Sequence, residues 1–254
     1  MTPSGRDPSI ARALLQLAEE PAPAGAGGLV DSLTRLCTAV VRHLPASGSG
    51  ISLVGEGHGS AGIAAAAGRS SRQLEELQFT LGEGPCGDAL AARPPMLEPD
   101  LAGAGCNRWP VYAPRAADLG VGAVFAFPLQ VGAARVGVLD IYRHQPGPLS
   151  PEALASGYAF ARVAMVLLLQ EQAETSEGQT PEGLDDALAY RMEVYQAQGI
   201  VMVDLHVKAD EAMARLRGHA FATDRDITDV ARDVIDGNLH LDQDHPSHEP
   251  GDGS

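Results

Sequence analysis

The spacing of apolar residues differs between the two parts of this chain. Up to residue 174, short runs rich in β-branched and aromatic residues alternate with segments that repeat apolar positions every three or four residues. The first pattern is typical of strands and the second of amphipathic helices. After residue 183 only the helical spacing continues. Strands with helices before and after them predict an α+β sheet domain over residues 29–174, followed by an all-helical module over residues 184–241.

The sheet domain should be built around one central hairpin. Two runs, 122–131 and 134–144, are long and rich in β-branched and aromatic residues, and a turn at Gly132 joins them. Ser150 is a good N-cap for a helix that begins at Pro151. The other predicted strands are 51–56, 62–68 and 94–101, the last at a sheet edge because its prolines cannot donate ladder hydrogen bonds. The predicted helices are 29–41, 71–82, 84–93, 109–120 and 151–174.

Three segments do not have the composition of a packed domain. Residues 1–28 contain a short helical pattern and end in the stretch PAPAGAGG, a composition that stays flexible. A polar linker, 175–183, separates the two folded parts. The tail, 242–254, is acidic and has no apolar residue, which predicts disorder. The helical pattern near the N-terminus consists of Ile10, Leu14, Leu15 and Leu17.

The helical module should contain three helices, and the first of them carries two apolar rows. A helix with two rows needs two partners, so we expect it to pack on its own module and also on a second chain or on the helix before the linker. The module spans only 58 residues, and dimerisation would offset the limited stability of so small a core. One row is Leu188, Met192, Tyr195, Gly199 and Met202, and the other is Val194, Ala197, Val201 and Leu205.

Composition narrows the class of protein. Hydrophobic residues make up 44% of the chain, and no stretch approaches the roughly 20 uncharged apolar residues of a membrane helix. The N-terminal residues include acids where a signal peptide needs an apolar region, so we expect a cytoplasmic protein with no membrane partner. The net charge of −15 opposes indiscriminate binding to phosphate backbones or anionic lipid. The three cysteines are widely spaced and odd in number, which argues against a disulfide framework.

Four short motifs follow one another in the helical module. They read Gln-Ala-x-Gly, Ala-Asp-Glu-Ala, Leu-Arg and Asp-Val-Ala, and they begin at Gln196, Ala209, Leu216 and Asp229. In this order they resemble the ANTAR domain, over residues 196–235. The resemblance implies a three-helix unit that binds paired RNA stem-loops and acts in transcription antitermination, usually as a dimer.

Three segments of the sheet domain carry a second resemblance, namely 77–90, 108–114 and 124–143. They resemble a GAF domain of the kind that is fused to ANTAR modules in actinobacteria, and the likeness covers residues 45–173. It implies an antiparallel sheet flanked by helices, with a ligand-sized pocket on one face. Together the two resemblances imply a signal-responsive regulator, in which a GAF sensor controls an ANTAR RNA-binding module, rather than an enzyme.

The resemblance assigns RNA contacts to polar and basic side chains of the three-helix unit. Residues 184–241 contain six arginine or lysine residues against eleven acidic ones, a net charge of −5, whereas RNA-binding modules are usually basic. The family also commonly has a lysine where Gln198 stands. Two hypotheses remain open: an RNA-binding module, or a dimerisation and protein-interaction element that no longer binds RNA. The candidate RNA-binding residues are Gln198, Lys208, Arg215, Arg217 and Arg225.

Aromatic side chains are candidates to line a small-molecule pocket in the GAF-like domain, although they also suit a core. Strand alternation places Phe125 and Phe127 on one face of the sheet. The sequence identifies no cofactor, because the histidines do not have metal-ligand spacing and the loop 82–87 has no Lys-Ser/Thr of a phosphate-binding loop. The candidate pocket residues are Trp109, Tyr112, Phe125 and Phe127.

Cys86 raises a third hypothesis. It lies where a glycine-rich turn enters a helix, a position that can lower the pKa of a thiol. Some GAF-fold proteins reduce free methionine sulfoxide with cysteine pairs, so the resemblance also allows a thiol redox enzyme. The other interpretation is a small buried residue, as free cysteines often are. We expect a regulator, with no catalytic residue and no metal site.

Overall fold

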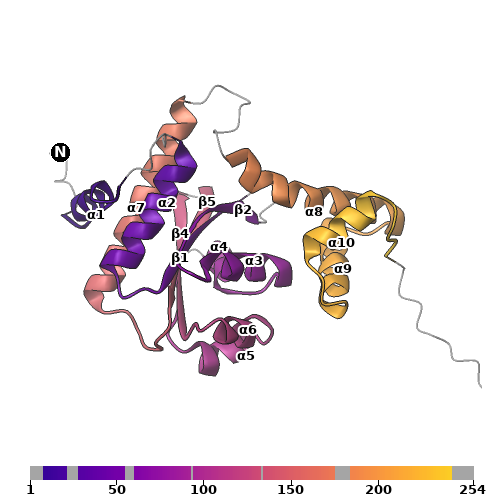
Figure 1. The fold of residues 1–254 in the computed structure, drawn as a ribbon, viewed down its shortest axis with the longest axis horizontal. Helices are drawn as coiled ribbons and strands as arrows, with labels where there is room; N and C mark the ends of the chain where they lie inside the picture. Colours follow the sequence, from indigo (N-terminus) through magenta and orange to yellow (C-terminus); the bar gives the residue numbers. More distant parts are fainter. Residues whose placement is uncertain are drawn as a thin grey trace, which may run out of the picture. The chain divides into compact units, whose positions relative to one another are not determined.

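The computed structural model describes residues 8–21, 28–54, 60–92, 94–132, 134–174 and 184–241 (Figure 1). Residues 22–27 of the flexible stretch, the linker 175–183 and the tail 242–254 lie outside the described residues. The chain divides into two compact units, 1–188 and 189–254.

A five-stranded antiparallel sheet forms the centre of the first unit (Figure 1). Its strands lie in the order β2-β1-β5-β4-β3, which places β5 in the middle. The predicted pairing of the two long strands is confirmed, and the proline-flanked strand β3 lies at an edge, as predicted. The strands are β1 (Gly48–Val54), β2 (Ser60–Ala67), β3 (Met96–Glu98), β4 (Ala123–Val131) and β5 (Ala134–Arg143).

Helices cover both faces of this sheet, which confirms the α+β class (Figure 1). Side chains alternate along β5, so Leu139 and Ile141 join the core on one face, whereas Val138 and Tyr142 point to the other. The helices on the first face are α2 (Leu29–His43) and α7 (Pro151–Glu174). Those on the second are α3 (Ser71–Leu81), α4 (Pro85–Ala92) and α6 (Tyr112–Asp118), and two short turns, η1 (Leu101–Gly105) and α5 (Cys106–Arg108), lead into α6.

The predicted helix ends are confirmed by their hydrogen bonds. Helix α3 ends at Gly82, whose φ of 64° is in the left-handed region that glycine adopts most easily. Helix α7 begins after Ser150, whose hydroxyl oxygen accepts a hydrogen bond from the Ala153 amide at 3.2 Å. Among the described residues, α7 is the one helix long and apolar enough to cross a membrane, and here it packs on α1, α2 and β4.

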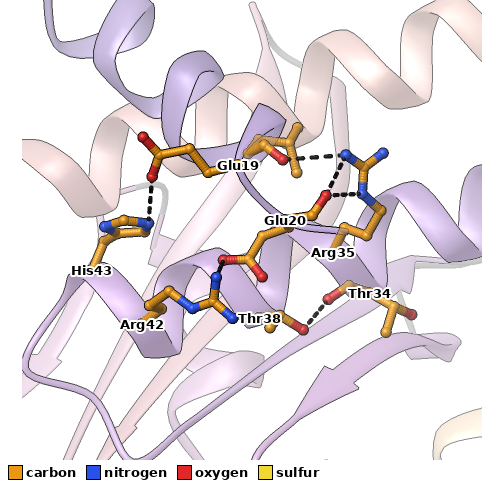
Figure 2. Close-up of polar contacts among 8 residues, drawn as sticks. Glu19, Glu20, Thr34, Arg35, Thr38, Arg42 and His43 are labelled. Atoms are coloured by element: carbon orange, nitrogen blue, oxygen red, sulfur yellow. Dashed lines mark hydrogen bonds and ion pairs between the residues drawn. The ribbon is translucent and has the colours of Figure 1, made fainter. Parts of the chain in front are cut away.

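Helix α1 (Pro8–Ala18) packs against α2 and α7, and Figure 2 shows polar contacts of Arg35, Arg42 and His43 with Glu19 and Glu20. The Arg35 guanidinium of α2 donates hydrogen bonds to the backbone carbonyls of Leu17 at 3.3 Å and Glu20 at 2.8 Å, and the Leu17 carbonyl also accepts one from the Glu20 amide at 3.1 Å. The Glu20 carboxylate is buried and pairs with Arg42 at 3.0 Å. The end of α1 is therefore fixed to α2 by two arginines.

The three helices predicted after the linker are present, and all but the first residues of these helices lie in the second unit. Asp226 accepts a hydrogen bond from the Thr228 amide at 2.7 Å and caps the last helix, which is followed by Gly237 with a φ of 72°. One apolar row of the first helix, Val194, Ala197 and Val201, is buried in the core. The other row is partly exposed, and 62% of Met192 is accessible to solvent. The helices are α8 (Leu184–Leu205), α9 (Ala209–Ala222) and α10 (Ile227–Ile235).

Candidate functional site

Five polar side chains are buried between the sheet and α3, and we call them the carboxylate cluster. Glu75 accepts hydrogen bonds from the hydroxyls of Ser52 at 2.7 Å and Tyr142 at 2.8 Å. The Gln78 amide donates to a carboxylate oxygen of Asp140 at 2.9 Å and to the Tyr142 hydroxyl at 3.2 Å. Two carboxyl groups thus lie side by side in a region from which water is excluded.

Local sequence explains how these side chains meet. Asp140 and Tyr142 are two residues apart on β5, so they point to the same face of the sheet. Glu75 and Gln78 are three residues apart on α3, so they share the buried side of that helix. Gly50 of β1 pairs with Asp140, and a Cβ atom at this position would overlap the Glu75 carboxylate. The cluster therefore depends on a glycine in the neighbouring strand.

The two carboxyl groups cannot both be ionised easily. Burial raises the pKa of Asp140 well above its ordinary value, and the nearby charge of Glu75 raises it further, although hydrogen bonds from Gln78 and Tyr142 oppose this. Burial, followed by the charge of Glu75, also raises the pKa of Tyr142. The buried pair therefore favours one proton shared between the two carboxyl groups over two negative charges.

The loop after α3 connects three helices. Glu83 accepts hydrogen bonds from the amides of Val111 at 2.8 Å and Tyr112 at 2.9 Å, at the start of α6. The Gln78 side-chain oxygen accepts from the Cys86 amide at 2.8 Å, at the start of α4. Because the oxygen of the Gln78 side-chain amide is held by this bond, the nitrogen of that side chain points toward the carboxyl groups. The glycine-rich loop thus organises the helical layer over the carboxylate cluster.

The four predicted pocket aromatics do not form one site. Trp109 and Tyr112 pack edge to face, 6.3 Å apart, on the same side of the sheet as the carboxylate cluster. Phe125 and Phe127 share a face, as predicted, but it is the opposite face, where Phe127 packs against Tyr158 of α7 at 5.4 Å. Side chains alternate along β4, so Val124 and Ala126 face the side of Trp109 and Tyr112, whereas Phe125 and Phe127 point to the other core.

Two buried oxygen atoms on this side of the sheet have no hydrogen-bond partner among the described residues. One is the Tyr112 hydroxyl, and the other is the second carboxyl oxygen, Oδ1, of Asp140. Burial raises the pKa of Tyr112, and the charges of Asp140 and Glu75 raise it further; Tyr112 belongs to the same core as Tyr142. A buried polar atom without a partner is costly.

The cysteines occupy different environments. All three are free thiols, and Cys37 and Cys86 are buried whereas Cys106 is partly exposed. Burial raises the pKa of Cys37 to about 12, which keeps it protonated and unreactive. In the part of the chain that the structure describes, no three metal-ligating side chains are grouped as a metal site.

Most candidate RNA-binding residues of the second unit already have intramolecular partners. Arg215 pairs with Glu211 at 3.0 Å, and Arg225 with Asp233 at 2.6 Å. Arg217 lies next to Tyr195, and burial lowers the pKa of its guanidinium.

The remaining two candidates lie at the corner between α8 and α9. Gln198 donates a hydrogen bond to the Ala209 carbonyl at 2.6 Å. Lys208 is exposed just before α9 and has no ion pair within the described ranges.

Sequence reasoning identified the surface candidates but not the carboxylate cluster. Glu75 and Gln78 look like ordinary polar positions of an amphipathic helix. The signal that could have revealed the cluster is Asp140, a charged residue that interrupts the apolar run of a predicted central strand.

Comparisons with known proteins agree with this division. Residues 28–169 match the model of the GAF domain family, and residues 182–235 match that of the ANTAR domain family. The first match covers more than half of the chain. No curated protein matches the chain significantly.

Solved structures resemble the first unit. The GAF domain of a phosphoenolpyruvate-protein phosphotransferase from Coxiella burnetii has a TM-score of 0.51 at 19% identity, over 65% of this chain and 96% of that one. A domain described as part of a two-component sensor histidine kinase, from Sinorhizobium meliloti 1021, has a TM-score of 0.50 at 17% identity, over 61% and 100%. Free methionine-R-sulfoxide reductase from Neisseria meningitidis has a TM-score of 0.47 at 16% identity, over 68% and 96%.

Proposed function

Because the chain belongs to the GAF domain family and carries an ANTAR domain behind the GAF domain, we propose that it is a signal-responsive regulator. In this proposal a small molecule binds the GAF domain and changes how the ANTAR domain binds paired RNA stem-loops in transcription antitermination. The observation that carries the proposal is the pair of family matches, in this order, on one chain. Helix α7 packs on the sheet of the sensor and leads through residues 175–183 into α8, which offers a route for the signal.

The ion pairs of the ANTAR domain are compatible with RNA binding if phosphate replaces their acidic partners. Arg225 and Arg215 form exposed or partly exposed pairs, and such pairs contribute only about 0.2–1 kcal/mol. A phosphate can therefore compete for these arginines at small cost. Lys208 needs no such exchange. The proposal places the first phosphate contacts at Lys208 and Gln198, with Arg215 and Arg225 joining them.

The proposal includes dimerisation through α8. The partly exposed row of α8, which includes Met192, Tyr195 and Met202, presents apolar surface outside the core of its own unit. A second copy of α8 would cover this row and enlarge a small core. Sedimentation analysis at high micromolar concentration should then detect a dimer, and a monomer at that concentration would contradict this part of the proposal.

Binding to a paired stem-loop RNA, measured by fluorescence anisotropy across a series of salt concentrations, tests the RNA contacts. Lys208→Ala should weaken binding and reduce the salt slope by about 1, because one phosphate contact is lost. Arg69→Ala, which removes an exposed charge from the GAF domain, is the matched control and should leave the slope unchanged. The absence of binding even at low salt, where charge interactions are strongest, would exclude the RNA function.

A second candidate function is a protein-interaction regulator whose ANTAR domain does not bind RNA. The net charge of −5 and the internal ion pairs of Arg215 and Arg225 favour it. This alternative predicts a dimer that binds no stem-loop RNA at any salt concentration. The same anisotropy and sedimentation experiments therefore separate the two functions.

A further inference from the structure

The corner between α8 and α9 departs twice from local preferences within three residues. His206 has a φ of 56°, in the left-handed region that residues other than glycine rarely adopt. Lys208 occupies the N-cap position of α9, where a serine or aspartate side chain would accept a hydrogen bond from a free amide and a lysine cannot. Both departures cost stability, and residues that cost stability locally are concentrated at functional positions.

Hydrogen bonds to α8 fix the backbone on both sides of Lys208. Before it, the Val207 amide donates to the Met202 carbonyl of α8 at 3.3 Å. After it, the carbonyl of Ala209, the first residue of α9, accepts from the side-chain amide of Gln198 at 2.6 Å. The second bond spans eleven positions and joins the two helices directly. The direction in which the Lys208 side chain leaves the backbone is therefore set in part by Gln198.

The charges around the corner make this direction important. Lys208 is exposed, and Asp210 and Glu211 follow it in the first turn of α9. The two carboxylates are favourable at the positive end of the helix dipole, but they repel a phosphate. The lysine ammonium group ends a flexible stem, so it must be directed away from these carboxylates to meet a phosphate. A backbone that is fixed beforehand reduces the entropy lost when such a contact forms.

We propose that Gln198 is a positioning residue, whose bond to Ala209 fixes the start of α9 so that Lys208 is already placed to contact a phosphate of the RNA. The inference rests on the proposed function and extends it, because Gln198 acts on the RNA through Lys208 rather than by an independent contact. The effects of the two side chains on RNA binding are therefore coupled.

A double-mutant cycle on the full chain tests this coupling, with binding to the paired stem-loop RNA measured by fluorescence anisotropy at one low salt concentration. Gln198→Met removes the hydrogen-bond donor but keeps an unbranched side chain that favours a helix. It should weaken binding about fivefold when Lys208 is present, and less than about twofold in a Lys208→Ala background. Equal losses in both backgrounds would show an independent contact, and no loss in either would show no role, so each result would overturn the inference.

Hydrogen exchange gives a readout that needs no RNA. The Ala212 amide is bonded to the Lys208 carbonyl at 2.9 Å, so it reports whether the start of α9 is held. Gln198→Met should make this amide exchange about threefold faster, because opening of the first turn becomes easier. Gln73→Met, the same change at an exposed position of α3, is the matched control and should alter neither this exchange nor RNA binding. Unchanged exchange in Gln198→Met would contradict the positioning role.

Lys208→Ser measures whether the corner gives up stability for binding. A serine can cap α9, so the Tm of the ANTAR domain should rise by about 4 °C while RNA binding weakens. A lower Tm would mean that the lysine stabilises the corner, which is the opposite of the inference. If the unsubstituted chain binds no stem-loop RNA, the proposed function fails and the inference fails with it. If the chain binds RNA and the cycle shows no coupling, the inference alone is wrong.

Discussion

The GAF domain and the ANTAR domain use carboxylates in opposite ways. In the GAF domain, Glu75 and Asp140 are buried side by side, and one proton, not a basic side chain, limits their repulsion. In the ANTAR domain, Glu211 and Asp233 lie near the surface, and each pairs with an arginine. Buried carboxylates resist any change of partner, because water cannot replace a lost bond. Surface pairs can exchange one partner for another at small cost, which suits a domain proposed to meet phosphates.

The largest effect should come from filling the space that Gly50 leaves for the carboxylate cluster. Gly50→Ala places a methyl group where the Glu75 carboxylate lies, so the unfolding free energy of the GAF domain should fall by about 2–3 kcal/mol. The single tryptophan, Trp109, is buried in this domain and reports its unfolding in urea. Gly87→Ala is the matched control, because a Cβ atom there meets nothing within 4 Å and should change stability by less than about 1 kcal/mol. Equal losses of unfolding free energy in the two variants would contradict the role of Gly50 in leaving space for the Glu75 carboxylate.

A second effect concerns pH. In the unfolded chain Asp140 has a pKa of about 3.9, and in the folded protein its pKa is raised. Between these values the folded state keeps a proton that the unfolded state has released, so stability falls as pH rises above about 4. The slope reaches at most about 1.4 kcal/mol per pH unit for one proton. Urea unfolding of Asp140→Asn at several pH values should lack this part of the slope, and Asp118→Asn should retain it.

The smallest effect should come from the surface pairs. Arg225→Ala breaks the ion pair between Arg225 and Asp233. The Arg225 side chain is 38% exposed and that of Asp233 is 35% exposed. The unfolding free energy of the ANTAR domain should change by about 0.5 kcal/mol, and less at high salt. Circular dichroism during urea unfolding measures it. If the unfolding free energy fell as much as in Gly50→Ala, the surface ion pairs would stabilise their domain as strongly as the buried carboxyl groups stabilise theirs, and the contrast between the two domains would be wrong.

Sequence alone predicted the elements of both domains, because the signals were local. Ser150 and Asp226 were identified as helix caps from residue type and position, and both accept the expected hydrogen bonds. The prolines flanking β3 correctly predicted an edge strand.

Sequence could not show which side chains meet across the fold. Glu75 and Asp140 are 65 positions apart in the chain; Glu75 resembles a surface residue of its helix, and nothing near Asp140 in the sequence identifies its partner. Their contact depends on the packing of α3 over β5 and on the space that Gly50 leaves. The predicted aromatic pocket divided for the same reason, since the sheet lies between Trp109 and Phe127.

The attachment of α1 also affects where the sensor can be cut. The family match begins at residue 28, but α1 lies before it and its last carbonyls are bound by Arg35 (Figure 2). A fragment trimmed to the family boundary would leave Arg35 and Arg42 without their partners and would uncover the apolar surface of α2 and α7 that Leu17 now shields. The evolutionary unit recognised by similarity is therefore shorter than the folding unit. Ligand screens on the isolated sensor should start at or before Pro8.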